Sequence, residues 1–160
     1  AIIDGITLAQ GKFVLVMDSD FSHPPQMIQT MYEKLANNEF EIVIGSRYIS
    51  GGKFDDWPIH RKFMSRLAST LPKFLLGLNV NDSNSGFFAI RKDLIKNLSF
   101  EAIGEKILLE ILVKTKGSRI KEIPYICKNR KEGISKFSFS VIDNYFKLLR
   151  ILLAYNRKFS

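Results

Sequence analysis

The chain has 160 residues, of which 46% are hydrophobic and 25% are charged, a composition typical of one folded domain with a real core rather than a disordered chain. Its formal net charge of +8 indicates an anionic partner: a nucleic acid, an anionic lipid or a phosphorylated substrate. The single cysteine, Cys127, excludes an internal disulfide and a cysteine-based zinc cluster, and we expect it to be a buried thiol.

The hydrophobic pattern predicts helices and strands in alternation. Helices are expected over 1–11, 24–38, 60–78, 93–100, 104–117 and 137–160, with a kink at Pro72 in the third. Strands are expected over 12–18, 41–47, 85–91 and 119–130, the last an edge or bulged strand because it contains Pro124. Such an alternation indicates an open α/β sheet covered by helices on both faces, with its ligands at the carboxyl ends of the strands.

Two aspartates follow the apolar strand 12–18. Asp18 and Asp20 are two residues apart, so we expect their side chains on the same side, where they could hold one Mg²⁺ or Mn²⁺ ion. A second interpretation is local: Ser22 would cap the next helix, and acidic residues suit a helix start. The residues alone leave both readings open.

Basic residues gather on segments that are expected to converge on the same edge of the sheet. Arg47 ends the strand 41–47, Arg61 lies four residues before Ser65 on one helix face, and Arg130 and Lys136 lie in a basic loop. Each could be a solvated surface residue, but together they favour a phosphate site because arginine forks match phosphate oxygens.

The last helix has a wide apolar arc with basic edges formed by Lys147, Arg150, Arg157 and Lys158. This pattern is typical of a helix that lies in a membrane interface, and packing against the sheet is the alternative. No stretch reaches the roughly 18 apolar residues of a membrane span, and the first residues lack the pattern of a signal peptide. We therefore expect any action at a membrane to take place from its surface.

In this order the segments resemble dolichyl-phosphate mannose synthases and their relatives among the family 2 glycosyltransferases. The similar blocks are MDSDFSHPP, IVIGSRYISGG, Trp57 with Arg61 and Ser65, NDSNSGFFAIR, GEKILLEILVK and KEIPYICKNRKEGISK. The resemblance implies a GT-A-like, Rossmann-related fold: an open, mostly parallel sheet with helices on both faces. It also implies that the first βαβ half is absent, about 70 to 80 residues.

The resemblance assigns roles by matching position. Asp18 and Asp20 would bind Mg²⁺ or Mn²⁺ with Ser22 close to the ion, and Asp18, Asp20 and Arg47 would be the catalytic residues. The acceptor phosphate would be bound by Arg47, Arg61, Ser65, Arg130 and Lys136. The acceptor loop would contain Asp82, Ser85 and Gly86, with Gly86 allowing close backbone approach. Residues 1–137 would form a partial catalytic domain, and 138–160 its C-terminal amphipathic helix.

The implied reaction is a single inverting displacement in which a polyprenyl phosphate oxygen attacks the anomeric carbon of a nucleotide sugar, such as mannose in GDP-mannose. The partners would be this donor, a dolichyl or other polyprenyl phosphate and a membrane surface, with the chain peripheral on the cytoplasmic face. They could include a partner subunit. Alternatives are a glucosyl or other family 2 transferase, or a non-catalytic remnant that binds anionic lipid or a partner. A nucleic-acid partner is not expected, because the aromatic residues lie mainly in apolar runs.

Overall fold

The computed structural model describes residues 2–55, 57–101, 103, 106–128 and 139–159. Its helices are α1 (Ile2–Leu8), α2 (Met27–Ala36), α3 (Ile59–Leu76), α4 (Lys92–Ile95), α5 (Ile107–Lys114) and α6 (Phe139–Phe159). Its strands are β1 (Phe13–Val16), β2 (Ile42–Ser46), β3 (Lys53–Phe54), β4 (Phe88–Arg91), β5 (Ile120–Pro124) and β6 (Ile126–Cys127). The described part of the chain therefore alternates between helices and strands as the hydrophobic pattern predicts.

Four strands form an open sheet in the order β1-β4-β2-β5. β2 pairs with β5 in parallel, whereas β4 pairs antiparallel with both β1 and β2. Strands β1, β2 and β5 consequently run in one direction and β4 runs against them. The expected open α/β sheet with most strands in one direction is confirmed, and the reversed β4 is a feature that the hydrophobic pattern did not predict.

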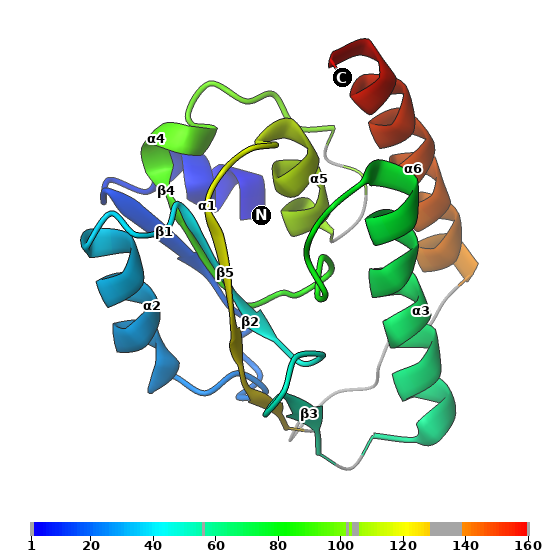
Figure 1. Cartoon of the computed structure of the whole chain (residues 1–160), viewed down its shortest axis with the longest axis horizontal. Coiled ribbons are helices and arrows are strands. Elements are labelled where there is room, and N and C mark those ends of the chain that lie inside the picture. The colour runs from blue at the N-terminus through cyan, green and yellow to red at the C-terminus, as the bar shows by residue number, and fades with distance from the viewer. Residues whose placement is uncertain (1, 56, 102, 104–105, 129–138, 160) are drawn as a thin grey trace.

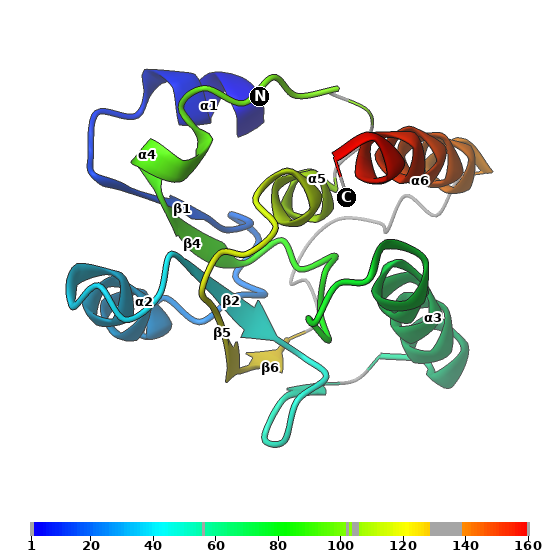
Figure 2. The ribbon, with the colours of Figure 1, turned by 45° about the horizontal axis from the view of Figure 1, so that its top comes forward.

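Helices cover both faces of this sheet, as Figures 1 and 2 show. Alternate strand residues face opposite sides. Val43, Phe87 and Ala89 pack in one cluster with Met31 and Leu35 of α2. A larger cluster on the other face combines apolar residues of the strands with those of the remaining helices: Val14, Ile44, Phe88 and Ile90 with Ile6, Leu76, Leu108, Leu109, Leu112, Leu148 and Leu152. Burial on both faces explains why the strands are continuous apolar runs.

The predicted strand 119–130 is divided in the structure. β5 lies at an edge of the sheet and ends at Pro124, which agrees with the expectation for a strand containing proline. After Tyr125 the chain continues as β6, which pairs in parallel with β3. β3 lies between the predicted strand 41–47 and the predicted helix 60–78, where we expected neither a strand nor a helix. The backbone N–H groups of Lys53 and Asp55 donate to the carbonyls of Tyr125 and Cys127, and these long-range bonds create the strand.

Several predicted helix boundaries are wrong. α1 ends at Leu8 rather than at residue 11, and α5 ends at Lys114 rather than at residue 117. α2 begins at Met27 rather than at residue 24, because Pro24 and Pro25 form turns whose carbonyls accept from Met27 and Ile28. Ser22 is therefore not the cap of this helix. α4 covers only Lys92–Ile95, since the apolar residues that follow it pack on the core without helical structure. α3 runs through Pro72 as one helix.

The last helix packs against the rest of the chain. Leu148, Leu149 and Leu152 of α6 are almost fully buried in the larger cluster, and the hydroxyl of Tyr145 donates to the carbonyl of Ala68 in α3. Figures 1 and 2 show α6 beside α3 and α5. Among the described residues, no helix is both long and apolar enough to span a bilayer.

Candidate functional site

The reversed direction of β4 brings three segments to one edge of the sheet. The chain leaves β1 towards Asp18 and leaves β2 at Arg47, both at the carboxyl edge. Because β4 is antiparallel to these strands, its first residue, Phe88, lies at the same edge, opposite Val16 of β1 and Ile44 of β2. The segment 81–87 that leads into β4 therefore reaches the ends of β1 and β2.

Asp18 is exposed and lies beside Gly86 and His23. A Cβ atom placed on Gly86 would lie 3.5 Å and 3.7 Å from the two carboxylate oxygens of Asp18, so the absence of a side chain at residue 86 keeps space open beside this carboxylate. The backbone N–H of Asp18 donates to Nδ1 of His23 at 3.0 Å. The ring of His23 is stacked on Phe87 at 4.9 Å and meets Tyr125 edge-on at 5.5 Å.

His23 is 4% exposed, and this burial lowers its pKa although Asp18 and Asp20 act in the opposite direction. A neutral imidazole can accept at Nδ1, which matches its bond with Asp18.

The turn after Asp20 is built from local polar contacts. Oδ1 of Asp20 accepts from the backbone N–H of Ser22 at 3.0 Å, which is an Asx turn. Phe21 has a φ of 61°, a left-handed conformation that is uncommon for a residue with a side chain. This conformation turns the chain back, so that His23 reaches Asp18. The structure thus gives Ser22 a role in the turn, and its predicted contact with a metal stays a prediction.

The Asp18–Asp20 segment fits a divalent cation in its donor chemistry. Mg²⁺ is usually bound through one or two carboxylates, with substrate phosphates and water completing its coordination, and the open space at Gly86 lies beside one of these carboxylates. No cluster of three or more acidic, histidine or cysteine side chains suited to a metal occurs among the described residues. The protein part of such a site would accordingly be small and would depend on the ligands that a diphosphate supplies.

Arg47 is bound by Asp82 across the edge of the sheet. Oδ2 of Asp82 accepts from the backbone N–H and Nε of Arg47 at 3.0 and 2.8 Å, and Oδ1 accepts from Nη2 at 2.7 Å. The side chain of Asp82 is fully buried and that of Arg47 is 11% exposed. Burial alone would lower the pKa of Arg47, but its hydrogen bonds with Asp82 and the charge of that carboxylate raise it above the ordinary value.

The predicted acceptor loop is buried in the structure. Asp82, Ser83, Asn84 and Ser85 are all buried. Ser83 and Asn84 donate to carbonyls of α3, and Ser85 donates to the carbonyl of Gly45 at 2.7 Å. These residues therefore connect α3 to the end of β2, and their contact with an acceptor stays a prediction.

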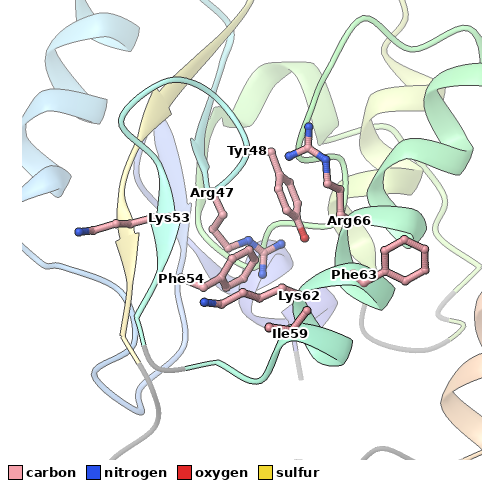
Figure 3. A pocket seen from close by; sticks show the side chains of 8 residues that line it. All are labelled: Arg47, Tyr48, Lys53, Phe54, Ile59, Lys62, Phe63 and Arg66. Atoms are coloured by element: carbon pink, nitrogen blue, oxygen red, sulfur yellow. The ribbon is translucent and has the colours of Figure 1, made fainter.

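A groove of about 380 Å³ opens beside Arg47. We call it the Arg47 groove, and it is lined by Arg47, Tyr48, Lys53, Phe54, Ile59, Lys62, Phe63 and Arg66. Figure 3 shows side chains of the segment 47–54 on one side and side chains of α3 on the other, with Arg47 and Phe54 close together at the centre. The lining thus combines four cationic side chains with aromatic and aliphatic ones.

The other predicted phosphate ligands lie near this groove or outside the described residues. The guanidinium of Arg61 lies 3.6 Å from the ring centroid of Trp57, and the hydroxyl of Ser65 accepts from Tyr48 at 2.7 Å. Neither belongs to the lining of the groove in the described structure. Arg130 and Lys136 fall in 129–138, outside the described residues, so their predicted roles stay predictions.

Sequence reasoning missed two parts of this site. Sequence reasoning assigned no role to His23, whereas in the structure Nδ1 of its ring accepts from the backbone N–H of Asp18. Lys62 and Arg66 are four residues apart on α3 and both line the groove; this spacing was the available signal. The helix face that meets the groove depends on how α3 docks, and a helical wheel alone does not determine that.

Residues 1–99 match the model of Glycosyl transferase family 2, and the chain belongs to this family. It is 39% identical to a dolichol-phosphate mannosyltransferase of Pyrococcus furiosus over 92% of this chain and 42% of that protein. It is 34% identical to a dolichol-phosphate mannosyltransferase of Saccharomyces cerevisiae, over 97% and 60% of the two chains. It is 36% identical to an undecaprenyl-phosphate mannosyltransferase of Micrococcus luteus, over 84% of this chain and 57% of that protein. The chain thus spans about half the length of these curated relatives.

The fold is similar to that of glucosyl-3-phosphoglycerate synthase from Mycobacterium tuberculosis. A structure of that enzyme in complex with Mn²⁺ and UDP-glucose superposes with a TM-score of 0.68 at 18% identity, over 96% of this chain and 52% of that one. A second structure, with phosphoglyceric acid, gives a TM-score of 0.67 over 97% and 53%. At this identity the likeness concerns the fold, and it confirms the expected GT-A-like class.

Proposed function

We propose that this chain is the metal- and acceptor-binding part of a transferase that moves mannose from GDP-mannose to a polyprenyl phosphate. The proposal is supported by the relatives named above, whose names describe mannosyl transfer to dolichol phosphate or undecaprenyl phosphate. The observation that carries it in this chain is the Arg47 groove, whose lining suits an anionic head group attached to an apolar chain.

The chemistry of the groove matches a phosphate monoester. Asp82 uses Nε and one hydrogen of Nη2 of Arg47, so the edge of the guanidinium formed by Nη1 and the second Nη2 hydrogen remains for a phosphate oxygen. Lys62 and Arg66 add positive charge on the opposite wall. A phosphate monoester is mostly ionised near neutral pH, so it can act as a nucleophile without a strong base from the protein.

Asp18 and Asp20 would hold Mg²⁺ or Mn²⁺ at the edge of the sheet. The bound ion would neutralise charge on the diphosphate that leaves. Gly86 keeps space beside Asp18, and His23 and the Asx turn of Asp20 orient the segment. The chain itself supplies few ligands, which accords with an ion that is bound together with the nucleotide diphosphate.

We also propose that α3 docks this chain on a membrane surface. Ile59, Phe63 and Leu67 lie four residues apart on α3 and are each at least half exposed, so they form an apolar stripe on one face of the helix. Lys62 and Arg66 lie next to this stripe, and the net charge is +8. Apolar residues flanked by basic ones favour binding to anionic lipid, the medium in which a polyprenyl phosphate resides.

The proposal is tested by sugar transfer. The chain is incubated with Mn²⁺, dolichyl phosphate and either labelled GDP-mannose or labelled UDP-glucose, and lipid-linked sugar is extracted. We expect labelled lipid from GDP-mannose. If labelled lipid forms only from UDP-glucose, the donor in the proposal is wrong and UDP-glucose takes its place. No product from either donor, with binding of a soluble isoprenyl phosphate intact, would contradict the catalytic role and favour a chain that only binds lipid phosphate.

A further inference from the structure

We propose that Asp82 is a positioning residue for phosphate binding: it fixes the guanidinium of Arg47 so that one edge faces the groove, and Glu122 in turn fixes Asp82. The inference rests on the proposed binding of a phosphate at Arg47. It gives a function to a buried carboxylate that does not itself line the groove.

The carboxylate of Asp82 is fully engaged. It accepts the three bonds from Arg47 and lies 3.5 Å from the hydroxyl of Ser69 in α3. Binding through Nε and Nη2 uses one edge of the planar guanidinium, so the direction of the adjacent edge formed by Nη1 and Nη2 is determined as well. Because Asp82 also accepts from the backbone N–H of Arg47, both the start and the end of this side chain are held by one group.

Asp82 is held by Glu122 of β5. Oε1 of Glu122 accepts from the backbone N–H of Asp82 at 3.0 Å, and Oε2 accepts from the backbone N–H and Nδ2 of Asn81 at 2.9 Å each. A carboxylate on a sheet strand thus fixes the backbone of the loop that carries Asp82. The series Glu122, Asp82, Arg47 runs from the edge strand of the sheet to the groove.

The arrangement separates two physical roles of Asp82. As a negative charge near the groove, it would repel a phosphate, and its neutralisation would tighten phosphate binding. As an orienting group, it orders the long side chain of Arg47 before the phosphate binds, which lowers the entropic cost of binding. Its neutralisation would then weaken binding. The complete engagement of its oxygens with Arg47 favours the orienting role.

The test measures the affinity of the 160-residue chain for citronellyl phosphate, a soluble isoprenyl monophosphate, by calorimetry. We expect Asp82→Asn to lower the affinity about tenfold or more, the loss of one or more charge-assisted hydrogen bonds. Glu122→Gln, which leaves Asp82 and Arg47 in place, should give a smaller loss in the same direction. This second variant keeps the test decisive if Asp82→Asn does not fold.

Two further variants distinguish positioning from general destabilisation. Asp93→Asn is the matched control, because Asp93 binds Nε and Nη2 of Arg91 in the same two-bond geometry at an exposed site, and it should leave the affinity unchanged. In an Arg47→Ala background, Asp82→Asn should have no further effect on the affinity, because Asp82 acts through Arg47. In an NMR spectrum, the chemical shift of the Arg47 Nε–H should move towards that of the solvent-exposed arginines in Asp82→Asn.

The outcomes separate the inference from the proposed function. If Arg47→Ala weakens binding while Asp82→Asn leaves it unchanged or tightens it, the positioning role is wrong and phosphate binding stands. If the two losses add, Asp82 does not act through Arg47, and the inference is again wrong. If the chain does not bind citronellyl phosphate, or Arg47→Ala binds as well as the unaltered chain, the phosphate site itself is wrong and the inference fails with it.

Discussion

The backbone N–H of Asp18 donates to Nδ1 of His23. A residue five positions further along the chain thus fixes the backbone of the first aspartate of the candidate metal segment. His23 itself packs against the rings of Phe87 and Tyr125, which also contact each other. Because Phe87 precedes β4 and Tyr125 follows β5, the position of Asp18 depends on strands that are distant in the sequence.

Replacing His23 by leucine should destabilise the chain. Leucine fills the space beside the rings of Phe87 and Tyr125, but it removes the partly buried hydrogen bond from the N–H of Asp18, a loss of about 0.5–1.5 kcal/mol. The free energy of unfolding is measured in urea. His60→Leu is the control: His60 is exposed, and its replacement should change the free energy by less than about 0.5 kcal/mol. Equal effects of the two substitutions would show that the bond with Asp18 contributes nothing.

Replacing Asp18 by asparagine should weaken Mn²⁺ binding by about tenfold or more, because a neutral amide replaces a charged oxygen ligand. Affinity is measured by calorimetry or by the electron paramagnetic resonance signal of free Mn²⁺, with and without GDP. Asp143→Asn is the control, since Asp143 forms an exposed ion pair with Lys147 in α6. Unchanged Mn²⁺ affinity in Asp18→Asn would remove this residue from the metal site.

Alanine at Gly52 should destabilise the segment beside Arg47. A Cβ on Gly52 would lie 2.5 Å from the carbonyl oxygen of Ser46 and 2.9 Å from the carbonyl carbon of Arg47, so backbone would have to move, at a cost of about 1–3 kcal/mol. Gly5 in α1 is the matched control, because nothing lies within 4 Å of its Cβ position. Gly5→Ala should stabilise the chain by up to about 1 kcal/mol, through helix propensity. If the thermal unfolding curve of Gly52→Ala coincides with that of the unaltered chain, a side chain at residue 52 is tolerated and the prediction is wrong.

Aspartate at Phe63 should lower binding to anionic lipid vesicles. Phe63 is 66% exposed on α3, and Figure 3 shows its ring turned away from the centre of the groove. Loss of its insertion and the added negative charge should reduce the bound fraction at least about tenfold. Flotation with vesicles that lack polyprenyl phosphate measures this. Ile28→Asp is the control, since Ile28 is partly exposed on α2, on the other face of the sheet; equal losses for the two variants would refute docking through α3.

The thiol of Cys127 should be unreactive in the folded chain. Burial raises its pKa, so the folded chain binds the thiol proton more tightly than the unfolded chain does. The resulting contribution to the free energy of unfolding is present at neutral pH and is lost as the pH rises through the raised pKa. Because the chain has one cysteine, a disulfide reagent at pH 8 reports on this site alone. We expect slow reaction in buffer and fast reaction in urea, and fast reaction in buffer would show that the thiol is accessible.

Deletion of α6 would be a poor test of its predicted role at a membrane. Leu148, Leu149 and Leu152 lie in the core, so removing the helix would expose the larger cluster and would destabilise the fold itself. α6 packs on the core through these leucines, as one of the two sequence-based readings expects. Val141 and Phe146 remain exposed, and the predicted place of this helix in a membrane interface stays a prediction.

Local patterns were sufficient to place Asp18 and Arg47. Each follows a short apolar strand, and the period of the hydrophobic residues together with the glycines and prolines that end the segments is readable from the sequence alone. The boundary of α2 was not readable in this way, because Pro24 and Pro25 were compatible with both a turn and a first helical turn. The bond between His23 and Asp18 also depends on the left-handed conformation of Phe21, which its residue type does not favour.

The sequence by itself determined the alternation of helices and strands, the family, and the positions of Asp18, Asp20 and Arg47 at strand ends, because these follow from local periodicity and short motifs. Only the tertiary structure decided the direction of β4. A parallel β4 would have carried Asp82 and Gly86 to the opposite edge of the sheet, whereas the antiparallel strand brings Gly86 beside Asp18 and Asp82 onto Arg47. Strand direction depends on pairing between residues far apart in the chain, and the pattern within one strand is the same in either direction.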